Sequence, residues 1–241
     1  GQGAELAGVG ALEGDHVAEC FEQLQERLPG LVDPSNFRRH VDTPVTVDQF
    51  RELLREGRYD VVHFAGHGRF DARHPERSCW RFSDGDLYAF ELRHTLANAA
   101  VTPWLVYGSA CEGARETGEA PRGYHDGVYG MASAALGQGV SAYIGPLWRI
   151  PETDAKNLAS VFYQALLLRR TSIGEALALA RRLVREGRAG DDDAFAPVVE
   201  NGGADLQDIE LVRSAGWTGI ALYGDPTPTI LQRLSPSEAQ G

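Results

Sequence analysis

The sequence has few cysteines, a deficit of cations and no long apolar run. Its three cysteines, Cys20, Cys79 and Cys111, are spread widely over 241 residues. An odd number at wide spacing is not a disulfide framework and is typical of a reducing compartment, so we expect a cytoplasmic protein. There are 23 lysines and arginines against 34 acidic residues, which gives a net charge of −11. This balance argues against direct nucleic-acid binding, because contacts to phosphates need clustered cations.

The chain also lacks the segments that direct a protein into or across a membrane. No apolar run approaches the roughly 18 residues of a membrane-spanning helix, so we expect no membrane association. Residues 1–20 have neither a basic start nor a long apolar stretch, which argues against a secretory leader. The sequence begins at Gly1 and its one methionine is Met131, so we expect a domain taken from a longer protein. The length fits a single α/β domain over 1–241, with an acidic loop insertion at 187–208.

What the chain does contain is an alternation of strand and helix patterns. Short apolar runs predict strands at 37–41, 61–65, 104–109, 141–145 and 218–223. Amphipathic segments predict helices at 17–28, 46–57, 91–97, 128–136, 152–168 and 172–186. The alternation across a turn at 79–89 predicts a hairpin. Strands that alternate with helices predict a doubly wound α/β sheet and not a sandwich of two sheets.

Two of the predicted strands lead into reactive side chains. His67 follows the strand at 61–65, and Cys111 follows the strand at 104–109. Ligands of an open parallel sheet bind beyond the carboxyl ends of its strands, so we expect both residues on one rim. A histidine and a cysteine there would supply a base and a thiol nucleophile. Gly68 would let the backbone approach a bound peptide, and the N–H groups of Gly68 and Cys111 are candidate oxyanion donors.

Each of these residues also has a simpler interpretation. A free cysteine is often a small core residue, but two reactive residues at two strand ends favour a catalytic pair. His63 lies inside its strand and is expected to be a core histidine with a satisfied hydrogen bond. A four-residue step along a strand separates His63 from His67 by roughly 13 Å, so we expect no zinc site and no other metal. The sequence of residues 109–113 differs at one residue from the nucleophile elbow of the α/β-hydrolase fold. That fold needs its histidine after the nucleophile in the chain, whereas His67 precedes Cys111, so we do not expect an α/β-hydrolase.

Four segments, taken in order, resemble the CHAT domain of caspase-like cysteine peptidases, in the clan that includes caspases and separase. The segments are residues 59–68, 104–113, 145–148 and 220–226. The resemblance implies a caspase-like three-layer α/β sandwich with a mostly parallel central sheet, helices on both faces and a small β-hairpin. It also implies a cytoplasmic bacterial cysteine endopeptidase that uses a His67/Cys111 dyad and needs no cofactor.

The resemblance further implies a setting in signalling or defence, where such domains cleave a partner protein. A regulatory repeat domain or an activator protein is then a second partner. The polar segment at 112–126 follows the cysteine directly, and we expect it to become ordered when a partner binds. A catalytically silent interaction module with the same fold is the alternative, although such modules usually lack the cysteine or the histidine.

Substrate preference is predicted from the segment that follows the strand at 141–145. Trp148 followed four residues later by Glu152 is similar to the separase segment in which an acid at that spacing receives arginine. With Asp154 two residues further on, a basic residue before the scissile bond is favoured. Arg149 could instead neutralise Glu152. Glu152 could also simply begin the helix that follows, because acidic residues stabilise a helix N-terminus. A leucine-type pocket is the alternative. For the acidic insertion, residues 191–193 lack the alternating oxygen ligands and turn glycine of a calcium loop, so no calcium site is expected.

Overall fold

The computed structural model describes residues 6–10, 37–40, 45–71, 73–112, 126–147, 150–189 and 218–229. Several predicted features lie outside these residues. They are the helix at 17–28, residues 113–125 of the polar segment, Trp148, and residues 190–208 of the acidic insertion.

A single sheet forms the centre of the molecule. Its main path runs, from one edge to the other, β2 (Phe37–His40), β1 (Leu6–Gly10), β3 (Val61–Arg69), β6 (Leu105–Glu112), β7 (Ala142–Pro146) and β8 (Ile220–Gly224). Neighbouring strands are parallel except for β8, which is antiparallel to β7. The chain passes from β1 to β2 on one side and returns to β3 on the other, so its winding direction reverses. The predicted doubly wound, mostly parallel sheet is confirmed.

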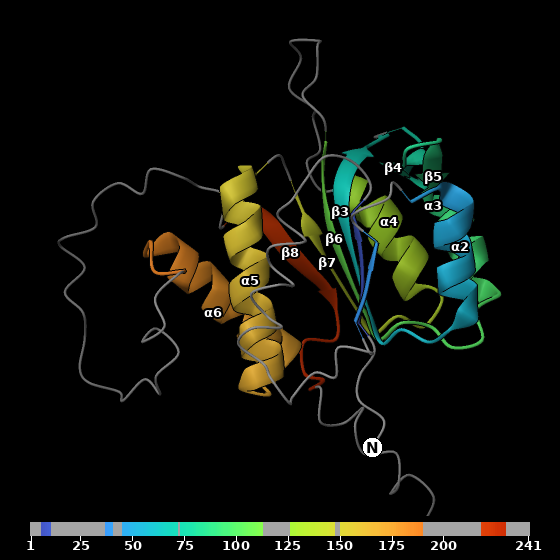
Figure 1. The fold of residues 1–241 in the computed structure, drawn as a ribbon. Helices are drawn as coiled ribbons and strands as arrows, with labels where there is room; N and C mark the ends of the chain where they lie inside the picture. The colour runs from blue at the N-terminus through green and yellow to red at the C-terminus, as the bar shows by residue number, and fades with distance from the viewer. Residues whose placement is uncertain are drawn as a thin grey trace, which may run out of the picture.

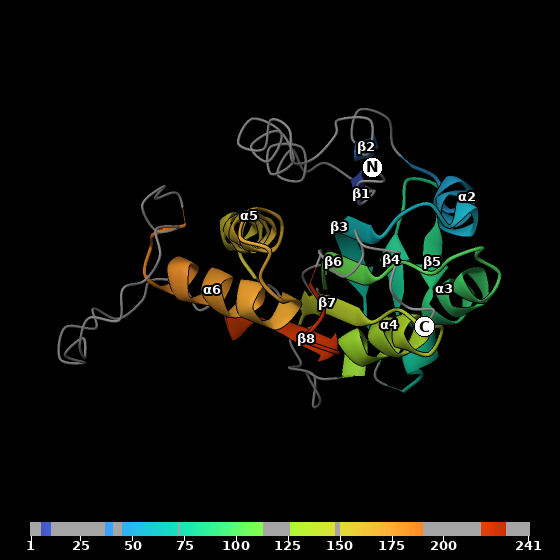
Figure 2. The ribbon, with the colours of Figure 1, turned by 90° about the horizontal axis from the view of Figure 1, so that it is seen from below.

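Helices cover both faces of this sheet (Figures 1 and 2). The helices are α2 (Val47–Glu56), α3 (Ala89–Ala97), α4 (Asp126–Leu136), α5 (Glu152–Leu168) and α6 (Ile173–Arg185). The α2, α3 and α4 side buries Val62, Phe64 and Val106, whereas the α5 and α6 side buries Val61, Ala65 and Leu105. Alternate residues of the same strands therefore enter different cores, as the two-residue period of a strand requires. The predicted three-layer arrangement is confirmed.

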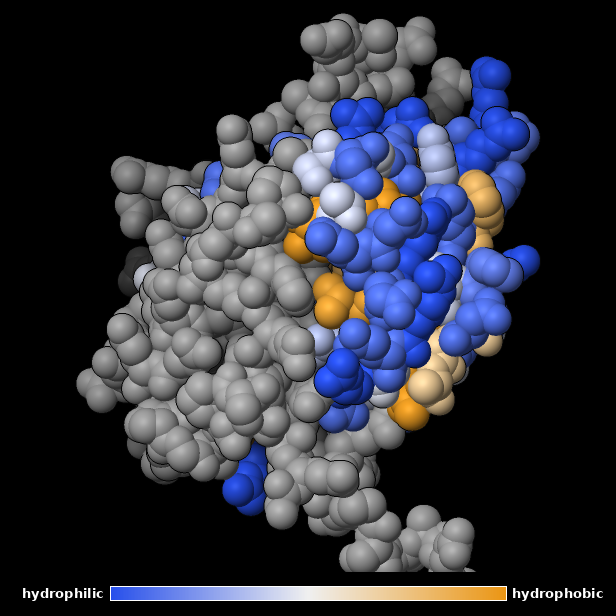
Figure 3. Space-filling model, turned by 45° about the vertical axis from the view of Figure 1, so that its right-hand side comes forward, coloured by the Kyte–Doolittle hydropathy of each residue, from blue (hydrophilic) through white to orange (hydrophobic). Residues whose placement is uncertain are grey.

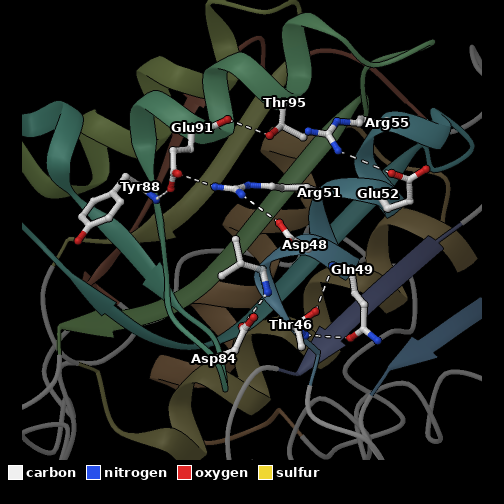
Figure 4. A network of polar contacts seen from close by, with 11 residues as sticks. Thr46, Asp48, Gln49, Arg51, Glu52, Arg55, Asp84, Tyr88, Glu91 and Thr95 are labelled. Carbon is white, nitrogen blue, oxygen red and sulfur yellow. Dashed lines mark hydrogen bonds and ion pairs between the residues drawn. The ribbon is translucent and has the colours of Figure 1, made fainter.

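The start of α2 shows how local sequence positions a helix against the sheet. Thr46 accepts a hydrogen bond from the backbone N–H of Gln49, and the Gln49 side chain accepts one from the Thr46 N–H, so the two residues form a capping box. Gly57 ends the helix in the left-handed region at φ 63°. Figure 4 shows that Arg51 forms ion pairs with Asp48, at 3.1 Å, and with Glu91 of α3, at 2.5 Å. These contacts join α2 to α3.

The predicted hairpin is present and lengthens a central strand. Strands β4 (Cys79–Arg81) and β5 (Asp86–Tyr88) pair antiparallel, and β4 also pairs with the end of β3. The prediction that strand 61–65 stops before His67 was wrong. β3 continues to Arg69 because Gly68 and Arg69 find backbone partners in Trp80 and Cys79. The histidine therefore lies within a paired strand, which restricts its backbone more than a loop would.

An aromatic cluster fixes the hairpin onto β3. The rings of Phe64 and Trp80 stack with centroids 4.4 Å apart and an interplanar angle of 7°. Phe50 of α2 meets both rings edge-on, and Phe82 packs against Phe50 and Phe64. Gly108 on β6 makes room for this cluster, because a Cβ there would lie 3.0 Å from Cζ2 of Trp80 and 2.7 Å from the neighbouring Tyr143 hydroxyl. Strand β3 is thus held from one face shortly before it reaches His67.

Candidate active site

The two candidate catalytic residues occupy neighbouring positions on adjacent central strands. β3 and β6 are parallel, and their register pairs His67 with Cys111 and Gly68 with Glu112. Neighbouring strands lie about 4.8 Å apart, so the two backbone positions are as close as two strands allow. Both strands are near their carboxyl ends at this point, as the sequence predicted. Residues 44 positions apart along the chain are thus brought together by sheet pairing alone.

Burial changes sharply along β3 towards this point. Residues 61–65 are buried, Gly66 is partly buried and His67 is exposed. By the alternation of a strand, position 67 continues the row of Val61 and Ala65 on the side of α5 and α6. Position 111 continues the row of Leu105 and Tyr107 on β6 in the same way. The two positions therefore belong to one face of the sheet, just beyond its core.

His63 lies in that core and not at the candidate site. It is 1% exposed, its ring stacks on Tyr107 at 4.6 Å between centroids, and Tyr163 of α5 lies 5.6 Å away. The prediction of a core histidine is confirmed. The rings of His63, Tyr107 and Tyr163 pack α5 against β3 and β6, four residues before the candidate pair on each strand.

Gly68 occupies a narrow space between β6 and the hairpin, in addition to its proposed role. A Cβ at this position would lie 3.2 Å from the Ala110 Cβ and 3.4 Å from the carbonyl oxygen of Cys79. These contacts come from β6 on one side and from the hairpin on the other. A larger side chain would push β3 away from one of them, and either movement would change the spacing between positions 67 and 111.

The structure places the two predicted pocket acids at the beginning of α5. In Figure 1 this helix starts at the same end of the molecule at which β3 and β6 end. Glu152 is the first residue of α5 and is exposed, whereas Asp154 is only 8% exposed. Residues two apart on a helix point about 200° away from each other, so the two acids face different sides of α5. Their assignment to a substrate pocket stays a prediction.

Cys79 differs from the candidate nucleophile by its surroundings. It is 1% exposed on β4, and burial raises the pKa of its thiol. The nearby Asp86 carboxylate acts in the same direction, while the Arg69 guanidinium opposes it. A thiol with these properties is a poor nucleophile, so Cys79 is a structural residue of the hairpin.

Sequence reasoning missed a hollow beside the end of β3. Arg69 and Phe70 line it together with residues of the following loop, β5 and α3. The signal available in the sequence was a run of arginines at 69, 73 and 77 in a chain of net charge −11. No motif marks such a hollow, because its lining residues lie up to 21 positions apart in the sequence.

The described residues offer no alternative metal-based site. Among the side chains that the structure describes, no three His, Cys, Asp or Glu residues gather where they could bind a metal ion. Within the same part of the chain, no helix combines the length and apolar character needed to cross a bilayer.

A mostly parallel sheet with helices on both faces, and a histidine and a cysteine in register at the ends of its central strands, is the arrangement of the caspase-like cysteine peptidase fold. The CHAT domain model matches residues 12–225, and the chain belongs to the CHAT domain family. The resemblance predicted from the sequence is confirmed.

Solved structures support the same fold. Gingipain R, an Arg-specific cysteine proteinase, aligns with a TM-score of 0.57 and 14% identity, covering 94% of this chain and 47% of that one. Separase of Saccharomyces cerevisiae, solved in complex with securin, aligns with a TM-score of 0.50 and 10% identity. That alignment covers 94% of this chain and 12% of separase. The chain therefore spans less than half the length of either protein. No curated protein matches the chain.

Proposed function

We propose that this domain is a cysteine endopeptidase that uses Cys111 as the nucleophile and His67 as the proton carrier. The observation that supports this most strongly is the register of the central strands, which pairs these two residues across β3 and β6. A nucleophile and its base have to be within hydrogen-bond reach, and neighbouring positions on one face of a sheet satisfy this requirement. The family and the fold agree with the assignment.

The reaction would follow from these two side chains and the backbone beside them. His67 takes the thiol proton, and the Cys111 sulfur attacks the carbonyl carbon of the scissile peptide bond. The carbonyl oxygen becomes an oxyanion, which the N–H groups of Gly68 and Cys111 would stabilise. Collapse of this intermediate breaks the C–N bond, and the leaving amine takes the proton from His67. Water then hydrolyses the thioester, releasing a carboxylic acid and restoring the thiol.

For the residue before the scissile bond we propose a preference for a basic side chain. Asp154 would be the recognising carboxylate, because a shielded acid discriminates charge more strongly than an exposed one. Glu152 is exposed and faces another side of α5, so it serves as the matched comparison. Trp148 would supply a flat wall for the aliphatic part of the substrate side chain. That gingipain R is Arg-specific is in line with this preference.

We place this activity in the bacterial cytoplasm, in signalling or defence, with a protein as substrate. Cleavage would be controlled by a repeat domain or an activator protein that orders the segment at 112–126. A peptidase of this kind has to be restrained, since an open cleft would cut unrelated proteins.

The test is a fluorogenic peptide library assayed with the purified chain. Cys111→Ala and His67→Ala should each abolish cleavage while leaving the circular dichroism spectrum unchanged, and a chelator should not affect the rate. Near-wild-type activity in Cys111→Ala would refute the nucleophile assignment. If no peptide is cleaved even when the regulatory repeat domain or the activator protein is present, the domain is a catalytically silent interaction module.

Specificity is tested with the same library. Asp154→Asn should lower kcat/KM for arginine-containing substrates by about 100-fold, because a shielded ion pair is lost. Glu152→Gln, with the same change of charge one half-turn away, should have little effect. A strong preference for leucine, unchanged in Asp154→Asn, would show that the acid is structural.

A further inference from the structure

The hollow beside the end of β3 has walls of two chemical kinds. It measures about 540 Å³ and lies between the end of β3, the short helix η2 (Pro75–Arg77), β5 and the start of α3. Its lining residues are Arg69, Phe70, Asp71, Arg77, Tyr88 and Phe90. Three aromatic rings and two guanidinium groups contribute to the lining, and the Arg69 guanidinium donates a hydrogen bond of 3.5 Å to the Tyr88 hydroxyl.

The aromatic side is held in place and open to solvent. The rings of Tyr88 and Phe90 stack with centroids 5.6 Å apart and an interplanar angle of 14°. Phe90 is nevertheless 49% exposed, which is unusual for so large an apolar side chain. Figure 3 shows that the described surface on this side is otherwise mainly hydrophilic, with only small apolar spots. The stacked pair is therefore a local apolar surface within a polar face.

The cationic side presents two arginines. The Arg69 guanidinium lies 5.9 Å from the centre of the Tyr88 ring and 3.5 Å from Asp86, yet about half of its side chain stays exposed. Arg77 is exposed and has no ion pair within 4.0 Å among the described residues. Asp86 forms an ion pair with Arg69 but is not one of the residues that line the hollow. Both arginines can therefore meet a ligand.

One acid, Asp71, also lines the hollow; its carboxylate interacts electrostatically with Arg77, so the lining holds two cations against one anion. The Asp71 carboxylate accepts hydrogen bonds from the backbone N–H groups of His74, at 2.9 Å, and Arg73, at 3.0 Å. These bonds close the turn that leads into η2. The acid thus shapes the loop that carries Arg77, and the hollow keeps a cationic rim.

We propose that this hollow binds an acidic segment of the peptide substrate, with carboxylates on Arg69 and Arg77 and an apolar or aromatic side chain on Tyr88 and Phe90. The charge of the rim is opposite to that of the chain as a whole, whose net charge is −11. An anionic peptide is favoured over a neutral one by the two arginines, and the aromatic surface distinguishes a peptide from a free anion.

The position of the hollow relates it to the candidate active site. Arg69 is two residues beyond His67 on β3, a step of roughly 7 Å along a strand. An extended peptide spans about 3.4 Å per residue. A substrate lying across the rim would therefore reach the hollow within roughly two to four residues of the scissile bond. That the bound segment belongs to a substrate rests on the proposed peptidase function, whereas binding itself does not.

Binding is tested without cleavage, using the Cys111→Ala chain. The probes are two fluorescein-labelled peptides, Ala-Asp-Glu-Phe-Asp-Ala and its neutral counterpart Ala-Asn-Gln-Phe-Asn-Ala, measured by anisotropy at low salt. The acidic peptide should bind more tightly. Arg77→Gln should weaken it about three- to fivefold, and added salt should do the same. Phe90→Ala should weaken both peptides.

Arg182→Gln is the matched control, because it removes an exposed arginine from α6, which does not line the hollow. It should leave both affinities unchanged. Equal binding of the two peptides, an equal effect of Arg182→Gln, or no binding up to about 1 mM would overturn the proposal. In the active chain, acidic substrates should have a lower KM that Arg77→Gln raises while kcat is unchanged. Selective binding without any cleavage would refute the peptidase function and leave the binding site standing.

Discussion

Alkylation by iodoacetamide should separate Cys111 from the other thiols and make its reactivity depend on His67. The expected difference in alkylation rate follows from the register of β3 and β6, which puts positions 67 and 111 about 5 Å apart. A thiolate and an imidazolium at that distance attract each other by about 3 kcal/mol at an effective dielectric constant of about 20. Such an attraction favours the thiolate by roughly 100-fold.

The expected gain in alkylation rate is smaller than the gain in the fraction of Cys111 that is ionised. An ordinary thiol is only about 1% ionised at pH 6.5, so the ion pair would raise the ionised fraction roughly 50-fold. A less basic thiolate is also a weaker nucleophile, which cancels about tenfold of this gain. Cys111 should therefore react about fivefold faster than an ordinary exposed thiol, and His67→Ala should remove this advantage.

The assay follows each cysteine by peptide mass spectrometry after timed alkylation at pH 6.5. Cys79 is the internal reference, because its burial and raised pKa should make it at least about tenfold slower. His74→Ala is the matched control, since it removes an exposed imidazole from the loop before the hairpin. The reasoning is refuted if His67→Ala leaves the Cys111 rate unchanged, or if His74→Ala lowers it equally.

Three further predictions concern the framework that carries the site. Phe64→Ala should lower the free energy of unfolding by about 3–5 kcal/mol, because it removes a fully buried ring that stacks on Trp80; a loss below about 1 kcal/mol in urea denaturation would contradict this. Gly130→Ala should cost about 1–3 kcal/mol, since a Cβ there would lie 2.2 Å from the Pro75 carbonyl oxygen, and an unchanged urea midpoint would show that α4 can move freely. Glu175 accepts the backbone N–H of the α6 N-cap residue, which lowers the pKa of its carboxyl, so its contribution to stability is present above its unfolded pKa and lost as pH falls through its folded pKa. The stability difference between wild type and Glu175→Gln should accordingly close on acidification from pH 7, and a difference that is the same at pH 7 and pH 3 would argue against this linkage.

Much of the fold could be predicted because local signals and tertiary packing agree. The Thr46 and Gln49 spacing and the later Gly57 marked both ends of α2. Helix α3 begins at Ala89, two residues before the predicted start, with Tyr88 as its N-cap residue and the Glu91 carboxylate accepting the Tyr88 backbone N–H at 3.0 Å. Sequence rules look for serine, threonine, aspartate or asparagine at the cap, so a tyrosine there gives no signal.

Strand ends were harder to predict than strand centres. The apolar run at 61–65 marks the buried part of β3, but the strand continues to Arg69 through residues with no strand pattern. Its extension depends on β4, which pairs with Gly68 and Arg69 from ten or more residues later. The register between β3 and β6 also depends on pairing between segments that are far apart in the sequence. The sequence could place His67 and Cys111 at one rim, but only the paired backbone sets one residue opposite the other.

The pocket acids show where spacing in a sequence carries more information than similarity of a motif. Glu152 occupies the place of the arginine-binding acid in the separase-type segment, and Asp154, two residues further on, was assigned to the same pocket. Because the segment is a helix, a separation of two residues turns the second side chain by about 200°, so the two acids point to different sides of α5. Their different exposure agrees with this geometry. The helix was itself predicted from the sequence, so the periodicity could have divided the pair into one recognising acid and one solvated acid. The two variants Asp154→Asn and Glu152→Gln should accordingly differ, and equal effects on arginine-containing substrates would mean that the substrate binds across the first turn of α5 instead of on one side of it.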